Sequence, residues 1–143
     1  MGIAALDREA WNHYGQPEII PDSEHAWRLW CEHALVFVAR DDASAGKEIV
    51  GVVLAFPCLN GSFCLHKVMV REDLRGQGIG SELFVACLDE LDTLRVAAFL
   101  TVNPENEPAI RLYGKWGFTE RKFVTGYYRS NEDRLVLTRP GLR

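Results

Sequence analysis

The sequence lacks the features that mark several large classes of protein. No apolar run approaches the ~20 residues that span a bilayer, and residues 1–11 have neither the basic start nor the sustained apolar segment of a secretory signal. An excess of basic residues is also missing: 16 Lys and Arg stand against 20 Asp and Glu, which gives a net charge of −4. Such a chain lacks the positive field of a nucleic-acid binder. We therefore expect neither nucleic acid nor a membrane as a partner.

The chain has four cysteines, and no two of them form the C-x-x-C pair that is typical of zinc sites and redox motifs. The histidines do not complete a zinc-binding spacing either. Isolated cysteines in apolar surroundings usually behave as small buried hydrophobic side chains. We therefore expect no disulfide framework and no structural metal, and we expect the protein to reside in the reducing cytoplasm.

The length and composition are those of one ordinary globular domain. The chain has 143 residues, of which 48% are hydrophobic and 25% are charged, and we expect a single domain over residues 1–143. Hydrophobic periodicity predicts a helix at 22–33, strands at 34–40, 48–56 and 63–70, a helix at 78–91, a strand at 96–102, a helix at 105–116, and strands at 118–128 and 134–139. Residues 1–20 show no clear strand pattern. This order predicts an α/β (α+β) domain with a mixed sheet, because an antiparallel run precedes strand–helix–strand crossovers.

The most informative segment joins the strand at 63–70 to the helix at 78–91 and contains three alternating glycines, Gly76, Gly78 and Gly80. Glycine lets the backbone turn tightly and bring several N–H groups close to a ligand. The first N–H groups of a helix lack intrahelical partners, and the helix dipole adds positive potential there. With Arg75 beside it, the turn predicts a phosphate site that is neither a P-loop nor a Rossmann fingerprint. A turn that merely ends a strand is the alternative.

Two motifs resemble those of a known family. The run from Arg75 to Gly80, after a strand that ends at Val70, resembles the R/Q-x-x-G-x-G/A signature of the GNAT superfamily of acyl-CoA-dependent N-acyltransferases. The family's N-x-x-A-x-x-L-Y-x-x-x-G-F pattern is similar to the downstream residues Asn106, Ala109, Leu112, Tyr113, Gly117 and Phe118. The resemblance covers residues 34–139 and implies a GNAT-like, mostly antiparallel mixed sheet, flanked by helices, with a splayed central strand pair. The family's usual first strand is not evident near the N-terminus.

The resemblance implies acetyl-CoA as the co-substrate. Its pantetheine arm is expected along the strand edge at Val68, Met69 and Val70. Its diphosphate is expected on the turn, at Arg75, Gly76, Gln77, Gly78, Ile79, Gly80 and Ser81. Asn106 matches a side chain that commonly hydrogen-bonds the cofactor, and the cap of a helix N-terminus is the other role open to it.

Two side chains are candidates for proton transfer. Tyr113 matches the residue that often acts as general acid in the family, protonating the departing thiolate; a core tyrosine on one helix face with Leu112 and Trp116 is the alternative. His66 is the candidate base, because its reference pKa of ~6.5 suits proton transfer near neutrality. A histidine packed within its strand is the alternative. No His–Asp pair is evident beside Cys64, so we expect direct attack by the amine without an acetyl-cysteine intermediate.

The acceptor is less sharply indicated. We expect acetyl transfer to a primary amine of a small molecule by a monomer or homodimer. A peptide N-terminus is an alternative acceptor, because Tyr127-Tyr128 followed by Glu132-Asp133 resembles the hairpin of peptide N-terminal acetyltransferases. For the two tyrosines, a place in an ordinary surface hairpin is the other role left open. For the protein as a whole, the second alternative is an acyl-CoA-binding module without catalytic activity. Aromatic residues that can line an acceptor pocket are Trp11, Tyr14, Trp27 and Trp30, although helical spacing favours the core for Trp27 and Trp30.

Overall fold

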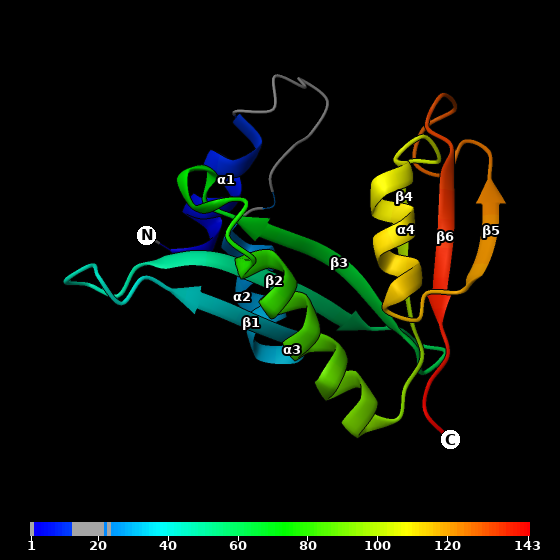
Figure 1. Cartoon of the computed structure of the whole chain (residues 1–143), viewed down its shortest axis with the longest axis horizontal. Coiled ribbons are helices and arrows are strands. Elements are labelled where there is room, and N and C mark those ends of the chain that lie inside the picture. Colours follow the sequence, from blue (N-terminus) through cyan, green and yellow to red (C-terminus); the bar gives the residue numbers. More distant parts are fainter. Residues whose placement is uncertain (1, 13–21, 23) are drawn as a thin grey trace. The chain divides into compact units, whose positions relative to one another are not determined.

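The structure is a computed structural model that describes residues 2–12, 22 and 24–143 (Figure 1). Its elements are α1 (Ile3–Asn12), α2 (Glu24–His33), β1 (Leu35–Arg40), β2 (Ile49–Pro57), β3 (Phe63–Val70), the 3-10 helix η1 (Glu72–Leu74), α3 (Ile79–Leu94), β4 (Ala98–Val102), α4 (Glu107–Lys115), β5 (Glu120–Val124) and β6 (Arg134–Arg139). The strands form one six-stranded sheet in the order β1-β2-β3-β4-β6-β5. The β3–β4 pair is parallel, whereas β1–β2, β4–β6 and β5–β6 are antiparallel. This confirms the predicted mixed sheet.

The chain forms two compact units, and the boundary between them passes through β3 and α3. The first unit contains residues up to Phe56 and Lys67–Glu90, and the second contains Pro57–His66 and Leu91–Arg143. Within the described residues, no helix is long and apolar enough to cross a bilayer. The same residues contain no group of three or more acidic, histidine or cysteine side chains that could hold a metal ion.

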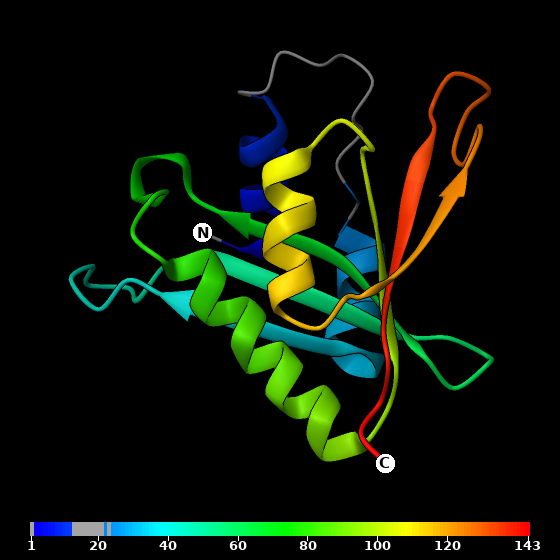
Figure 2. The same cartoon turned by 45° about the vertical axis from the view of Figure 1, so that its right-hand side comes forward.

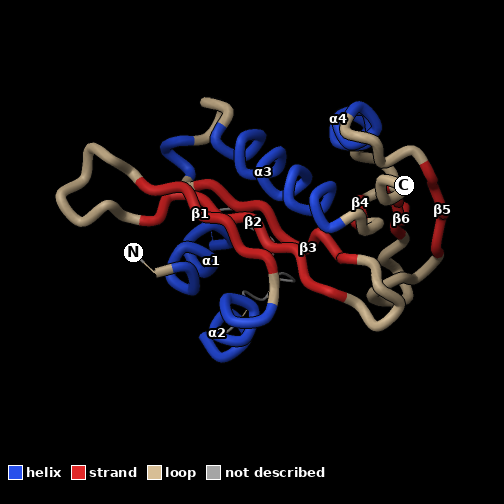
Figure 3. Tube along the Cα trace, turned by 90° about the horizontal axis from the view of Figure 1, so that it is seen from below, coloured by secondary structure: helices blue, strands red, loops and turns tan. Residues whose placement is uncertain are grey.

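In the first unit, helices cover both faces of the strands. Figure 3 shows α1 and α2 on one face of β1–β3 and α3 on the other. The core beneath α1 and α2 consists of Leu6, Ala10, Trp27, Val52, Leu54 and Met69. On the opposite side, α3 buries the apolar face that its periodicity predicts: Leu83, Phe84, Cys87, Leu88 and Leu91. The sequence patterns did not predict α1, although Leu6 and Ala10 are buried at helical spacing within it.

In the second unit, α4 lies against the antiparallel strands β4, β6 and β5 (Figure 2). Its core includes Leu100, Ile110, Phe118 and Leu137. Gly117, with φ +96°, ends the helix in the left-handed conformation that the sequence predicts. The predicted strand at 118–128 is shorter in the structure: β5 ends at Val124, because Gly126 adopts φ +60° and the chain turns there.

Candidate functional site

The glycine-rich turn begins directly after β3 and η1. Gly76 and Gly78 have φ values of +80° and +86°, and α3 starts at the next residue, Ile79. A Cβ atom at either glycine would meet nothing within 4 Å, so backbone conformation rather than space requires glycine there. The strand, tight turn and helix start therefore follow one another as the sequence predicts.

The turn presents backbone N–H groups without partners in the described part of the chain. Among the described residues, no backbone N–H of Gly76–Ser81 donates a hydrogen bond within the protein, and the first N–H with a partner is that of Glu82, which donates to the carbonyl of Gly78 at 3.0 Å. These donors lie at the positive end of the α3 dipole. A convergence of free N–H groups at a helix N-terminus suits a diphosphate.

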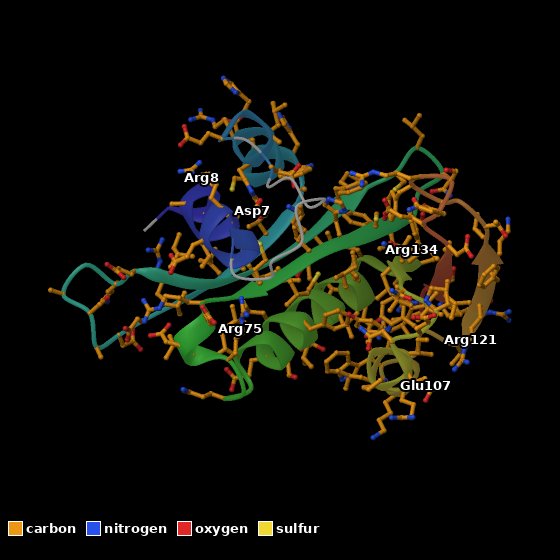
Figure 4. All side chains as sticks on the ribbon, turned by 90° about the horizontal axis from the view of Figure 1, so that it is seen from above. Asp7, Arg8, Arg75, Glu107, Arg121 and Arg134 are labelled. Carbon is orange, nitrogen blue, oxygen red and sulfur yellow. The ribbon has the colours of Figure 1, made fainter. Side chains whose placement is uncertain are left out.

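Two arginines hold the turn in place, and one of them was not singled out by the sequence patterns. The Arg71 guanidinium donates to both carboxylate oxygens of Asp73, at 2.6 and 3.0 Å, and to Glu48 at 3.3 Å. These bonds keep the pKa of the Asp73 carboxyl below its ordinary value. The Nε atom of Arg75, labelled in Figure 4, donates to the carbonyl oxygen of Val70 at 3.0 Å. Together they tie the start and end of η1 to the adjoining strands.

A close approach between α3 and the sheet positions the same helix N-terminus. A Cβ atom at Gly51 would lie 2.9 Å from a side-chain carbon of Leu83, 3.3 Å from one of Ile79 and 3.3 Å from the carbonyl oxygen of Met69. A side chain at this position of β2 would therefore require Leu83 and its neighbours to shift. No sequence pattern singles out Gly51, because its role depends on a helix that begins 28 residues later, at Ile79.

The predicted pantetheine strand, β3, pairs with β4 at its N-terminal end. The parallel pairing joins Phe63 to Ala98 and Cys64 to Phe99. A strand edge without a ladder partner can pair with an extended amide-containing ligand. Toward the C-terminal end of β3, the Met69 side chain is buried in the first core, whereas Val68 and Val70 approach the position of a Cβ atom on Gly80, at 3.8 and 3.5 Å.

The remaining predicted residues belong to the second unit. Asn106 caps α4, because its side chain accepts a hydrogen bond from the N–H of Ala109 at 3.3 Å, as one of its two predicted roles requires. Tyr113 is half-buried with its ring 6.1 Å from that of Phe118, and burial raises the pKa of its phenol. Leu112, which was placed on the apolar face of this helix, is instead 41% exposed, because Ile110 takes the buried position. His66 lies exposed on β3.

The thiol of Cys64 is expected to be unreactive. It is buried, and burial followed by repulsion from Cys58 raises the pKa of its thiol to about 12. The thiol therefore stays protonated at neutral pH and is a poor nucleophile. This supports the expectation of direct transfer.

The loop between β5 and β6 presents two tyrosines whose rings contact each other. The rings of Tyr127 and Tyr128 meet edge to face at 4.7 Å, and the guanidinium of Arg134 lies 5.4 Å from the centre of the Tyr128 ring. The Tyr128 hydroxyl is hydrogen-bonded to that of Thr101 at 2.7 Å. The N–H of Tyr127 donates to the carbonyl of Glu132 at 2.8 Å, which closes the loop. The pair is exposed and ordered by contacts within its own unit.

Of the aromatic residues suggested for an acceptor pocket, Trp27 is buried, and Trp30 packs partly buried against it with ring centres 5.1 Å apart. This confirms a core role for both. Tyr14 and the side chain of Trp11 lie outside the described residues.

Comparisons with known proteins agree with this arrangement. The sequence model of the Acetyltransferase (GNAT) family matches residues 3–118. An N-alpha-acetyltransferase from Sulfurisphaera tokodaii is 30% identical over 142 residues, covering 90% of this chain and 83% of the relative. The crystal structure of the ribosomal-protein-S18-alanine N-acetyltransferase from Escherichia coli superposes with a TM-score of 0.74 at 25% identity, covering 98% of this chain and 86% of that one. A chain of the NatC complex bound to Gag peptide and CoA gives a TM-score of 0.74 at 22% identity, covering 97% and 90%.

Proposed function

Because this chain belongs to the acetyltransferase (GNAT) family and uses acetyl-CoA as its co-substrate, we propose that its acceptor is the α-amine of a peptide or protein N-terminus. That the protein is an acetyl-CoA-dependent N-acetyltransferase follows from its family. Sequence patterns alone favoured a small-molecule amine as the acceptor. The observation that changes this order is the similarity to the N-alpha-acetyltransferase of Sulfurisphaera tokodaii, which covers 90% of this chain.

The tyrosine pair supports a peptide acceptor. Both rings are exposed, and the hydroxyl of Tyr128 is held by Thr101 while its ring faces Arg134. Phenol hydroxyls are suited to hydrogen bonds with the main-chain amides of a peptide, whereas a small amine has few such groups. The proposal keeps the expectation of a cytoplasmic monomer or homodimer.

In the proposed reaction, the turn at Gly76–Ser81 binds the diphosphate through its N–H groups, and the backbone of Val68–Val70 aligns the thioester with the amine. The neutral amine attacks the thioester carbonyl carbon, and the C–S bond breaks as the amide forms. The Tyr113 phenol donates its proton to the leaving thiolate, for which its raised pKa is suited, because the group stays protonated at working pH. His66, exposed to water, accepts the proton that the amine loses. Alignment alone contributes several kcal/mol to lowering the barrier.

The proposal is tested by offering acetyl-CoA with two kinds of acceptor. One set consists of short peptides with a free α-amine and the same peptides with a blocked N-terminus and an internal lysine. The other consists of polyamines, aminoglycosides and arylalkylamines. Thiol release is measured, and mass spectrometry locates the acetyl group. We expect acetylation of the free α-amine only.

The Tyr127→Phe/Tyr128→Phe variant supplies the internal control. It is expected to lose most peptide acetylation while its affinity for acetyl-CoA stays unchanged. Turnover of small amines with no reaction of any peptide would overturn the proposal in favour of a small-molecule acceptor.

A further inference from the structure

Asp7 is a fully buried charged side chain on α1 (Figure 4). One of its carboxylate oxygens accepts hydrogen bonds from the indole Nε1 of Trp27 at 2.8 Å and from the backbone N–H of Asp22 at 3.1 Å. Asp7 therefore connects its own helix, α1, with the residue two positions before α2 and with the core aromatic of α2. A buried carboxylate without such partners would be strongly destabilising.

The positive charge that balances this carboxylate comes from β3. The Nζ atom of Lys67 donates to both oxygens of Asp7, at 3.3 and 3.1 Å, and forms a second ion pair with the carboxylate of Asp22. The Lys67 side chain is only 11% exposed. Breaking one partner of a buried pair is costly, because the other charge then stays buried without compensation. The cluster of Asp7, Lys67 and Asp22 thus links α1 and the start of α2 to one residue of β3.

Lys67 lies next to the part of β3 at which acetyl-CoA is proposed to bind. Lys67 comes directly before Val68–Val70, the stretch proposed for the pantetheine arm. Because side chains alternate along a strand, Lys67 and Met69 share the face covered by α1 and α2, whereas Val68 and Val70 face the first turn of α3. With the diphosphate at the turn after Val70, the thioester end of the arm lies toward Lys67.

The acceptor amine cannot approach the thioester equally well from the two faces of β3. The first turn of α3 belongs to the acetyl-CoA side, since it carries the diphosphate donors and packs against Val68, Val70 and Gly51. In a direct transfer, the amine must reach the thioester from a side that the acetyl-CoA molecule does not occupy. Within the first unit, the elements on the other side of β3 are α1 and α2, which the Asp7 cluster ties to the strand.

We propose that the buried cluster of Asp7, Lys67 and Asp22 is a positioning device for the acceptor, which fixes α1 and the start of α2 relative to the thioester end of β3. The inference deepens the proposed function and rests on it only for the location of acetyl-CoA, because any amine acceptor would meet the same side of the strand. Its three residues are positioning residues and do not touch the reacting atoms.

The test uses two variants of the cluster and one matched control. Lys67→Met keeps most of the length of the side chain and removes its charge. Asp22→Asn removes the second carboxylate at a site that is 31% exposed, so this variant is expected to fold even if the first does not. Glu32→Gln breaks the exposed Arg28–Glu32 pair on α2 and serves as the control. For each, the Kd of acetyl-CoA is measured by calorimetry, and KM and kcat are measured with the best acceptor of the wild-type protein, whichever class that proves to be.

Both cluster variants are expected to raise the KM of the acceptor about tenfold or more, while the Kd of acetyl-CoA changes less than about twofold, and Glu32→Gln is expected to behave as wild type. A purely structural role would not alter one substrate selectively. The inference is overturned if a folded Asp22→Asn or Lys67→Met variant keeps the wild-type acceptor KM, or if acetyl-CoA affinity falls in parallel. If peptides prove to be no acceptors, the proposed function fails while this test still stands with the small amine that reacts.

Discussion

The carboxylate of Asp92 accepts two hydrogen bonds from the guanidinium of Arg139, at 2.6 and 2.9 Å. The Nε atom of the same guanidinium donates to the carbonyl of Trp116 at 2.8 Å, at the C-terminus of α4. One side chain of β6 thereby joins the end of α3 to the end of the helix that carries Asn106 and Tyr113. A fork of this kind is specific to arginine.

Asp92→Asn is expected to lower the free energy of unfolding by about 1–2 kcal/mol at pH 7, toward the lower end of the range for charged hydrogen bonds. We expect a loss near the lower end of that range because 28% of the Asp92 side chain is exposed to solvent, which screens the interaction. The bonds from Arg139 keep the pKa of this carboxyl below its ordinary value in the folded protein. The ionised Asp92 carboxylate therefore stabilises the folded protein fully above about pH 4, near the pKa of an aspartate in the unfolded chain. This stabilisation is lost as the pH falls through the lower pKa of Asp92 in the folded protein.

Urea unfolding at pH 7 and near pH 3 measures both effects. The difference between wild type and Asp92→Asn should shrink at the lower pH. Glu107→Gln, which removes the exposed Arg111–Glu107 pair, is the matched control and should change stability by less than about 0.5 kcal/mol. An equal loss for the two variants at pH 7 would contradict the role given to Asp92.

The alternating glycines of the turn are not equivalent, and this yields a second prediction. Gly78→Ala places a Cβ on a residue with φ +86°, which costs about 1–2 kcal/mol, and the turn relieves this strain by reorienting its N–H groups. Gly80 is not left-handed, and its added Cβ would make ordinary contacts of 3.5 and 3.8 Å with Val70 and Val68. We expect Gly78→Ala to raise the Kd of acetyl-CoA at least tenfold and Gly80→Ala to change it less than about twofold. Equal affinities in calorimetry would rule out the turn as the diphosphate site.

Tyr113→Phe separates catalysis from binding. If the phenol protonates the leaving thiolate, its removal is expected to reduce kcat by about 100-fold or more and to leave the Kd of acetyl-CoA unchanged. Burial raises the pKa of this phenol, so the wild-type rate should not fall on the alkaline side until above about pH 10. Steady-state kinetics of the two proteins across pH give both quantities. A kcat within a factor of two of wild type would show that Tyr113 is a packing residue.

The cysteines should differ sharply in reactivity. Cys31 is exposed, whereas burial raises the thiol pKa of Cys64 to about 12 and, with repulsion from Glu90, that of Cys87 to about 11. Iodoacetamide at pH 7.5 should therefore label Cys31 first and leave Cys64 unmodified in the folded protein. Peptide mapping by mass spectrometry reads out the sites. Rapid acetylation or alkylation of Cys64 would instead reopen an acetyl-cysteine route.

Local patterns predicted what depends on neighbours in the chain. The strands Phe63–Val70 and Arg134–Arg139 begin and end where their apolar runs do, and Gly117 takes the left-handed conformation expected at a helix end. The strand expected through Tyr128 was too long, because the propensity of its aromatic residues was outweighed by the turn at Gly126, whose N–H donates to Asp133 seven residues later. Such a closure is set by the loop as a whole.

Contacts between distant residues were beyond the reach of those patterns. In the sequence, Asp7 looks like an ordinary polar residue of a short helix. Its burial depends on distant partners, among them Lys67, sixty residues later, which supplies the opposite charge. From the sequence alone, Gly51 looks like a glycine that weakens an apolar strand. In the structure, α3 packs so closely there that a Cβ atom on this residue would lie 2.9 Å from Leu83. The predicted acetyl-CoA residues were recognisable because their motif is contiguous, whereas the residues that hold them in position are not.

Binding of the diphosphate by the backbone of Gly76–Ser81 is tested most directly by calorimetry with fragments of the co-substrate. Acetyl-CoA and dephospho-CoA, which keep the diphosphate, should each bind at one site per chain. Pantetheine, which lacks it, should bind at least about 100-fold more weakly, a difference of ~2.7 kcal/mol. Equal affinity for pantetheine and acetyl-CoA, or no heat with acetyl-CoA and folded protein, would show that the turn does not bind the diphosphate.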